Sequence, residues 1–156
     1  ERKRLGDWEG DTVESCDHKP GVNTLVERKT GYTFITKLKD KTSGATVTAV
    51  TQRMSVLPKK VKHTLTNDNG PENSDWIRVQ EQTNLSVFFA HPYCSGERGT
   101  NENTNGLIRD YFPKKTDFTQ IPDEIIQQVE YDLNTRPRKR LNWFTPLEAL
   151  SGALQG

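Results

Sequence analysis

Three acidic residues stand apart from the other Asp and Glu residues of this sequence by their positions. Asp11 falls inside a segment with strand character, where a carboxylate is unfavourable unless it faces a cleft or a cation. Asp68 lies in the turn-forming sequence Asn-Asp-Asn-Gly after an apolar segment, and Glu102 lies on a segment with helical periodicity. If the fold brings them together, they offer the hard oxygen ligands that Mg²⁺ and Mn²⁺ prefer.

A carboxylate set of this kind supports chemistry at phosphate. Two divalent ions about 4 Å apart activate a water or a 3′-hydroxyl on one side of a phosphodiester and stabilise the leaving oxygen on the other. Taken singly, the three residues leave other interpretations open. Asp11 also suits an exposed strand face, Asp68 an ordinary polar turn, and Glu102 a solvated helix surface.

The helix expected over residues 99–112 has two distinct faces at about 100° per residue. One stripe is polar and comprises Arg98, Glu102, Asn105 and Arg109. The opposite side is apolar and comprises Leu107, Ile108, Tyr111 and Phe112. A helix packed by its apolar side would therefore present Glu102 between arginines and amides.

The elements that must position these residues follow a mixed α/β order. Segments 8–14, 22–29 and 32–38 have strand character, and the short polar breaks between them predict an antiparallel meander. An amphipathic helix is expected over 43–57, followed by strands over 62–67 and 85–90 with a helix over 72–82 between them. A helix with apolar residues from Ile121 to Leu133 comes later. We expect one α/β domain over 1–156, a mixed five-stranded sheet of three antiparallel and then two parallel strands, flanked by helices.

Composition and charge limit the classes of function. The net charge is only +1, and 28% of the residues are charged against 31% hydrophobic, so the chain suits a folded domain with a very polar surface. Basic residues are clustered at Arg136, Arg138, Lys139 and Arg140, a distribution that suits phosphate contact as well as a solvated turn.

The two cysteines, Cys16 and Cys94, and the absence of any signal-peptide or membrane-spanning pattern favour an intracellular, reducing setting without membrane contact. A four-ligand zinc site formed by both cysteines with His18 and His91 is an alternative. Its spacing does not match a zinc finger.

Collinear motifs cover nearly the whole chain and resemble those of the IS-thirty family of bacterial insertion-sequence transposases. The early ones are Gly6-Asp7-Trp8-Glu9-Gly10-Asp11, Leu25-Val26-Glu27-Arg28-Lys29 and Thr66-Asn67-Asp68-Asn69-Gly70. The later ones are His91-Pro92-Tyr93, Arg98-Gly99-Thr100-Asn101-Glu102-Asn103, Tyr111-Phe112-Pro113-Lys114, Leu133-Asn134-Thr135-Arg136-Pro137-Arg138-Lys139 and Thr145-Pro146-Leu147-Glu148. The segment Arg-Gly-Thr-Asn-Glu-Asn is the most specific of them.

The resemblance implies an RNase H-like fold and a catalytic DDE triad on Asp11, Asp68 and Glu102, the last two separated by 33 residues. It implies Mg²⁺ or Mn²⁺ as cofactor, two ions per active site, and DNA cleavage followed by strand transfer without a covalent protein intermediate. The partners implied are transposon ends and target DNA, with a homo-oligomer for the full-length protein in the bacterial cytoplasm at the nucleoid. The helix-turn-helix region of such transposases is expected to lie outside this chain.

Candidate contacts to DNA are basic side chains, which suit its backbone, and two amides that would support either Glu102 or the strand being cut. They are Arg98, Asn101, Asn105, Arg109, Arg136, Arg138, Lys139 and Arg140.

The sequence departs from the family pattern at Cys94, Gly96 and Glu97, where serine, tryptophan and glutamine are usual, and at Asn73, where an aromatic residue is usual. These departures keep alternatives open: an inactive or domesticated domain that binds DNA or supports assembly, or a nuclease of the same fold.

Overall fold

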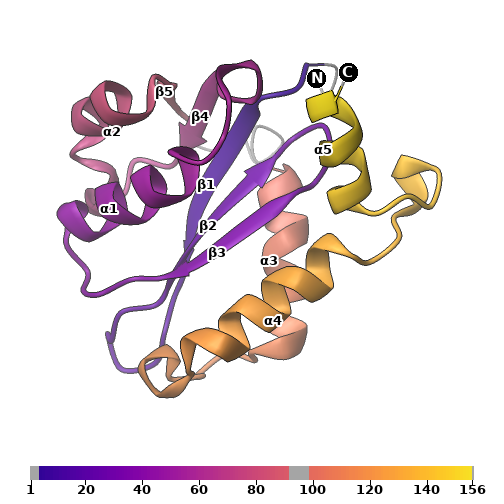
Figure 1. Ribbon diagram of the computed structural model, residues 1–156. Helices are drawn as coiled ribbons and strands as arrows, with labels where there is room; N and C mark the ends of the chain where they lie inside the picture. Colours follow the sequence, from indigo (N-terminus) through magenta and orange to yellow (C-terminus); the bar gives the residue numbers. More distant parts are fainter. Residues whose placement is uncertain (1–3, 92–98, 156) are drawn as a thin grey trace.

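A five-stranded mixed sheet crosses the protein in the order β3-β2-β1-β4-β5, as the computed structural model shows for residues 4–91 and 99–155 (Figure 1). The strands are β1 (Asp7–Val13), β2 (Val22–Glu27), β3 (Thr33–Lys37), β4 (Thr64–Asn67) and β5 (Ser86–Phe89). The helices are α1 (Ser43–Met54), α2 (Trp76–Thr83), α3 (Gly99–Tyr111), α4 (Asp123–Asn134) and α5 (Pro146–Gln155). No helix of the described residues is long and apolar enough to cross a membrane.

The strand pairing confirms the predicted sheet. β1, β2 and β3 pair antiparallel, whereas β4 pairs parallel to β1 and β5 parallel to β4. The helix predicted over 72–82 is divided into a 3-10 turn, η2 (Pro71–Asn73), and α2. The division has a local cause, because the Asn73 amide donates to the carbonyl and carboxylate of Asp68 and so holds η2 against the preceding loop.

Each face of the sheet has its own apolar cluster. On one face, Trp8 and Leu65 pack with Val47, Val50 and Met54 of α1. On the other face, residues of the strands pack against α3 and α4, and this cluster comprises Val13, Val22, Ile35, Ile108, Phe112, Phe118, Ile126, Val129 and Leu133. The sheet is therefore the central layer, with α1 and α2 on one side and α3 and α4 on the other (Figure 1).

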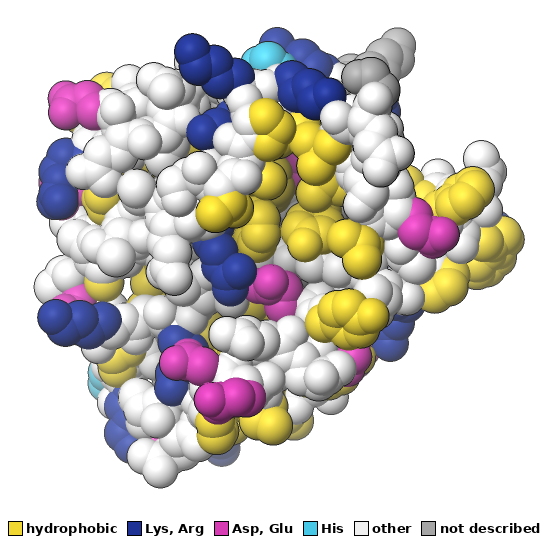
Figure 2. Space-filling view, in the orientation of Figure 1, with side chains coloured by type: hydrophobic (Ala, Val, Ile, Leu, Met, Phe, Trp, Pro, Cys, Tyr) yellow, Lys and Arg dark blue, Asp and Glu magenta, His cyan; other side chains and the backbone are white. Residues whose placement is uncertain are grey.

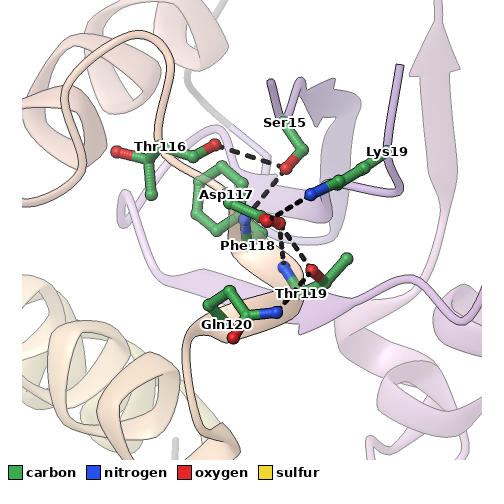
Figure 3. Close-up of polar contacts among 7 residues, drawn as sticks. All are labelled: Ser15, Lys19, Thr116, Asp117, Phe118, Thr119 and Gln120. Carbon is green, nitrogen blue, oxygen red and sulfur yellow. Dashed lines mark hydrogen bonds and ion pairs between the residues drawn. The ribbon is translucent and has the colours of Figure 1, made fainter. Parts of the chain in front are cut away.

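The turn after β1 is tied to the connection between α3 and α4 (Figure 3). Ser15 Oγ donates to the Thr116 carbonyl at 3.3 Å and accepts from the Phe118 N–H at 2.9 Å. Lys19 Nζ pairs with the Asp117 carboxylate at 2.7 Å, and this contact holds the pKa of Asp117 below its ordinary value. These contacts fix the carboxyl end of α3 relative to the end of β1.

The outer edge of β3 is covered by side chains instead of another strand. The Asn134 amide donates to the Thr33 carbonyl at 2.8 Å, and its oxygen accepts from the Thr33 N–H at 2.9 Å. Glu130 Oε1 accepts from the Ile35 N–H at 2.7 Å and pairs with Arg53 at 3.0 Å. Because the edge groups are satisfied, β3 is protected from pairing with another chain.

Glu130 gives the fold a pH dependence of defined sign. Burial raises the pKa of Glu130 above its ordinary value, although the Ile35 N–H and Arg53 oppose this rise. The folded protein therefore holds the Glu130 proton more tightly than the unfolded chain does. This contribution to stability is present at low pH and is lost as pH rises through the folded pKa.

We predict that Glu130→Gln gains stability relative to the parent as pH rises from about 4 to about 7. Urea unfolding at several pH values measures the free energy of unfolding of the variant minus that of the parent, which should increase with pH. A difference that stays constant or falls with pH would contradict the prediction.

Candidate active site

Alternate residues of β1 face α3 and meet residues on one stripe of that helix. The Asn101 N–H donates to Glu9 Oε1 at 3.0 Å, and the Asn101 amide donates to the Glu9 carbonyl at 3.2 Å. Two residues further along β1, Asp11 Oδ2 accepts from the Asn105 amide at 2.8 Å. Residues two apart on the strand therefore meet residues four apart on the helix, so that Glu9 pairs with Asn101 and Asp11 with Asn105.

Asp11 is half-buried on the α3 side of the sheet. Its second oxygen, Oδ1, accepts from the Thr12 N–H at 2.8 Å. The two donors orient the carboxylate, which resolves the open question about this strand residue. Asp11 faces a helix and not an exposed outer surface of the sheet.

Asp68 directly follows β4. The parallel register pairs Glu9 with Thr66, and a continuation of this register by two residues would bring Asp11 and Asp68 level on the same face. Asp68 Oδ1 accepts from the Gly70 N–H at 2.9 Å and from the Asn73 amide at 3.1 Å. The turn is therefore structural, and it also directs the carboxylate.

Gly10 precedes Asp11 in β1 and faces the opposite side of the sheet. A side chain at this position would collide with Asn67. A Cβ at Gly10 would lie 2.3 Å from Asn67 Oδ1 and 3.2 Å from Leu65 Cδ1. Asn67 is 7% exposed, so its amide has little room to move away. The glycine therefore permits β1 and the end of β4 to approach closely beside the two aspartates.

Glu102 is exposed and lies on the flank of α3 that turns away from α4. It is about 100° around the helix from Asn101, whereas the buried Thr100 and Thr104 lie on the other flank. α3 contacts β1, β2 and α4, and the sheet order places β4 on the side of β1 opposite to β2. The exposed flank with Glu102 is therefore directed away from β2 and α4.

No three His, Cys, Asp or Glu side chains come close enough to hold one metal ion within residues 4–91 and 99–155. The donors nevertheless fit a hard divalent cation, because Asp11 and Asp68 are carboxylates directed by hydrogen bonds and Glu102 has a solvent-exposed side chain that is free to turn. Of the four residues of the zinc alternative, Cys94 lies outside the described residues.

Glu9, which the sequence pattern did not single out, is fully buried beside Asp11 in β1. Its Oε2 lies 3.1 Å from Arg28 Nε as an ion pair, while Oε1 accepts from the first turn of α3. A carboxylate at a helix N-terminus is stabilised by the helix dipole. The signal was available, since Glu9 lies inside the same strand as Asp11 and is equally unfavourable there unless it has partners.

The amide candidates for DNA contact have partners within the fold. Asn101 is fully buried against Glu9, and Asn105 donates to Asp11, so both position the site. Arg109 donates to backbone carbonyls, the shortest contact being 3.0 Å to Glu14. Arg98 lies outside the described residues, as do the departures at positions 94, 96 and 97.

The basic cluster between α4 and α5 is partly structural. Arg138 is half-buried and donates to the Leu133 carbonyl at 2.8 Å. Burial lowers the pKa of Arg138, and the neighbouring Arg136 and Arg140 lower it further. Arg140 donates to the Lys29 carbonyl at 2.9 Å, whereas the side chains of Arg136 and Lys139 are exposed.

We predict that Glu9→Ala costs about 3 kcal/mol of unfolding free energy, because it leaves Arg28 and the first turn of α3 without their buried partner. Glu9→Gln keeps an acceptor for the Asn101 N–H and should cost less. Denaturant unfolding measures both, with Glu81→Ala as the control at an exposed glutamate of α2. Equal stability of Glu9→Ala and the parent would contradict this account of α3 docking.

We also predict that Gly10→Ala destabilises the protein by about 1–3 kcal/mol through overpacking against Asn67. Combining it with Asn67→Ala should recover part of this loss, because the second change removes the atom that the new Cβ meets. A double-mutant cycle measures the recovery. Additive losses would show that the two positions do not collide.

Comparisons with known proteins agree with the motifs. A transposase of the insertion sequence element IS30A from Escherichia coli is 42% identical over 149 residues, which are 96% of this chain and 39% of that protein. Transposases of IS1086 from Cupriavidus metallidurans and of IS4351 from Bacteroides fragilis are 36% and 41% identical and align with 99% and 94% of this chain. The chain spans 45% of each of these two relatives. No protein-family model matches the chain.

Solved integrase cores share the fold. The HTLV-2 integrase catalytic core domain in complex with magnesium superposes with a TM-score of 0.69 at 22% identity, covering 94% of this chain and 97% of that one. The catalytic core domain of BIV integrase gives a TM-score of 0.74 at 16% identity, covering 96% of each chain. The chain is therefore similar to the transposases of IS30A, IS1086 and IS4351 over nearly all of its own length, and it has the RNase H-like fold of integrase catalytic cores.

Proposed function

We propose that this chain is the catalytic part of a DNA transposase and that Asp11, Asp68 and Glu102 hold Mg²⁺ or Mn²⁺. The observation that carries the proposal is the parallel register of β1 and β4, in which Glu9 pairs with Thr66, together with the orientation of Asp11 toward α3. Continued by two residues, this register would bring Asp11 and Asp68 level on one side of the sheet, and Glu102 on the exposed flank of α3 would complete the set. Three oxygen donors from a strand, a strand end and a helix suit a hard divalent cation.

The related proteins support this proposal. The relatives are named transposases of insertion sequences, and one of the similar integrase cores was solved with magnesium. Because the chain spans only 39–45% of these relatives, recognition of element ends would depend on the remainder of such a protein. We expect the whole protein to act as a homo-oligomer on transposon ends and target DNA in the bacterial cytoplasm, at the nucleoid.

The side chains around the triad prepare it for the ions. Asn105 and the Thr12 N–H hold the Asp11 carboxylate in place, and Gly70 with Asn73 does the same for Asp68. When bound, two ions would activate the attacking water or 3′-hydroxyl and stabilise the leaving oxygen. A preorganised carboxylate pair lowers the cost of assembling that centre.

DNA contacts would lie at both ends of the sheet. Beyond the end of β1, Arg109, Lys114 and Lys115 line a pocket of ≈ 630 Å³ together with the acidic Glu14 and Asp17. At the other end of the sheet, Arg136 and Lys139 are exposed. These cations suit phosphate oxygens, whereas Asn101 and Asn105 serve the protein interior.

The test is Mn²⁺-dependent cleavage of a DNA oligonucleotide by the chain and by three variants, Asp11→Asn, Asp68→Asn and Glu102→Gln. Each variant should lose at least about 100-fold in rate while keeping its thermal midpoint, since each removes one anionic ligand of the ions. Asp110→Asn is the matched control, because Asp110 is another exposed acid of α3. Rate loss in the control equal to that of Glu102→Gln would contradict the assignment.

Products separate the competing functions. Joined strands indicate a transposase, whereas cut strands alone indicate a nuclease of the same fold. A second candidate, an inactive domain that binds DNA, is suggested by the unusual residues at positions 94, 96 and 97. It predicts DNA binding by the parent and all variants alike, with no cleavage in Mn²⁺.

A further inference from the structure

Two aromatic side chains project from the segment between α4 and α5. Trp143 is 66% exposed and Phe144 is 57% exposed. Among the other Trp, Tyr and Phe residues that the structure describes, only Tyr131 of α4, at 60%, has a greater exposed fraction than Phe144. Figure 2 shows hydrophobic side chains gathered on the protrusion that this segment forms at the right edge of the view. Exposed apolar patches of this kind often mark a surface that binds another molecule.

The segment is a closed, ordered loop and holds the rings in place. The Arg138 N–H donates to the Phe144 carbonyl at 3.0 Å, and the Trp143 N–H donates to the Arg138 carbonyl at 2.8 Å. Thr145 and Glu148 then cap the start of α5 reciprocally, at 2.9 Å and 3.0 Å. Because the backbone is already fixed, binding at the rings costs little ordering of the loop.

The backbone at the tip is unusual for the residues it carries. Asn142 has φ of +54° and Trp143 has φ of +69°, a left-handed conformation that residues with large side chains rarely adopt. The fold thus maintains a disfavoured conformation that directs an indole ring into solvent. Such strain is retained where surrounding contacts over-determine it, and it is concentrated at functional positions.

The loop that carries the rings is rich in positive charge. Arg136, Arg138, Lys139 and Arg140 lie in the same segment between α4 and α5, and the Asn142 N–H donates to the Lys139 carbonyl at 3.1 Å. Arg140 also fixes the loop to the β2–β3 turn through the Lys29 carbonyl. Aromatic rings among cations match a nucleic-acid strand, since the rings stack on bases while the cations neutralise phosphates.

We propose that Trp143 and Phe144, with Arg136 and Lys139, form a binding site for unpaired DNA, in which the rings stack on exposed bases. This site rests on the proposed function, because a DNA-cutting enzyme handles strands with exposed bases beside the cut. Duplex DNA, with its bases already stacked, does not offer these faces. A protein partner is the competing occupant, and the basic charge beside the rings favours DNA over it.

The test is fluorescence anisotropy with a labelled oligothymidine of about 20 nucleotides, longer than one binding site, and with a matched duplex. The titrations contain EDTA and no divalent ion, so a failure of metal-dependent cleavage does not alter them. Trp143→Ala should weaken oligothymidine binding about tenfold or more and duplex binding much less. Trp143→Phe keeps a ring and should retain most of the affinity.

Intrinsic fluorescence provides a readout that a merely structural role would not change. The chain has three tryptophans, of which Trp8 is fully buried and Trp76 is partly buried in the apolar cluster beside α1. Oligothymidine should therefore quench the parent protein, and Trp143→Phe should bind with that quenching lost. Ile77→Ala, at a 53% exposed residue of α2, is the control and should change neither readout.

Two outcomes would overturn the proposal. One is unchanged oligothymidine affinity in a folded Trp143→Ala variant, with circular dichroism and thermal midpoint like those of the parent. The other is a parent that sediments as a dimer and a Trp143→Ala variant that sediments as a monomer with the same DNA affinity, which would identify the rings as a contact between copies. Lys139→Ala should weaken duplex and single-strand binding alike, since it removes only a phosphate contact.

Discussion

The docking of α3 on β1 through polar groups is the constraint on which the site depends. Glu9 and Asp11 each accept hydrogen bonds from α3, and a buried carboxylate is tolerated only because it has such partners. An apolar interface would permit the helix to slide or rotate by small steps. Directional bonds at two levels fix the helix in one register, and Glu102 follows Asn101 directly in the chain.

The register of the sheet is the second constraint. β1 pairs parallel with β4 as far as Glu9 and Thr66, just before Asp11 and Asp68, and Gly10 leaves room for Asn67 on the opposite face. The edge of β3 is closed by Asn134 and Glu130, so the sheet presents its backbone groups to side chains of its own chain. The proposed site therefore rests on a sheet that is closed at one edge and tightly packed at its centre.

The acidic residues and the basic, aromatic loop of this chain suit different parts of the proposed reaction. The proposed ion ligands are Asp11 of β1, Asp68 after β4 and Glu102 of α3, while cations and exposed rings lie on the loop between α4 and α5. In these proposals ion binding and strand binding involve separate groups, which would allow a chain with a net charge of only +1 to serve a polyanionic substrate. The distribution of charge matters more here than its sum.

The sequence by itself determined the order of strands and helices, because hydrophobic period and turn residues act locally. Its motifs also singled out Asp11, Asp68 and Glu102 and the family. Only the tertiary structure decided that Asn101 and Asn105 serve β1 and that Glu9 is buried with Arg28. The sequence left these amides beside either Glu102 or DNA, because helical spacing gives a residue's direction around its own helix but not what lies there. That depends on contacts between residues about 92 positions apart, which no local pattern encodes.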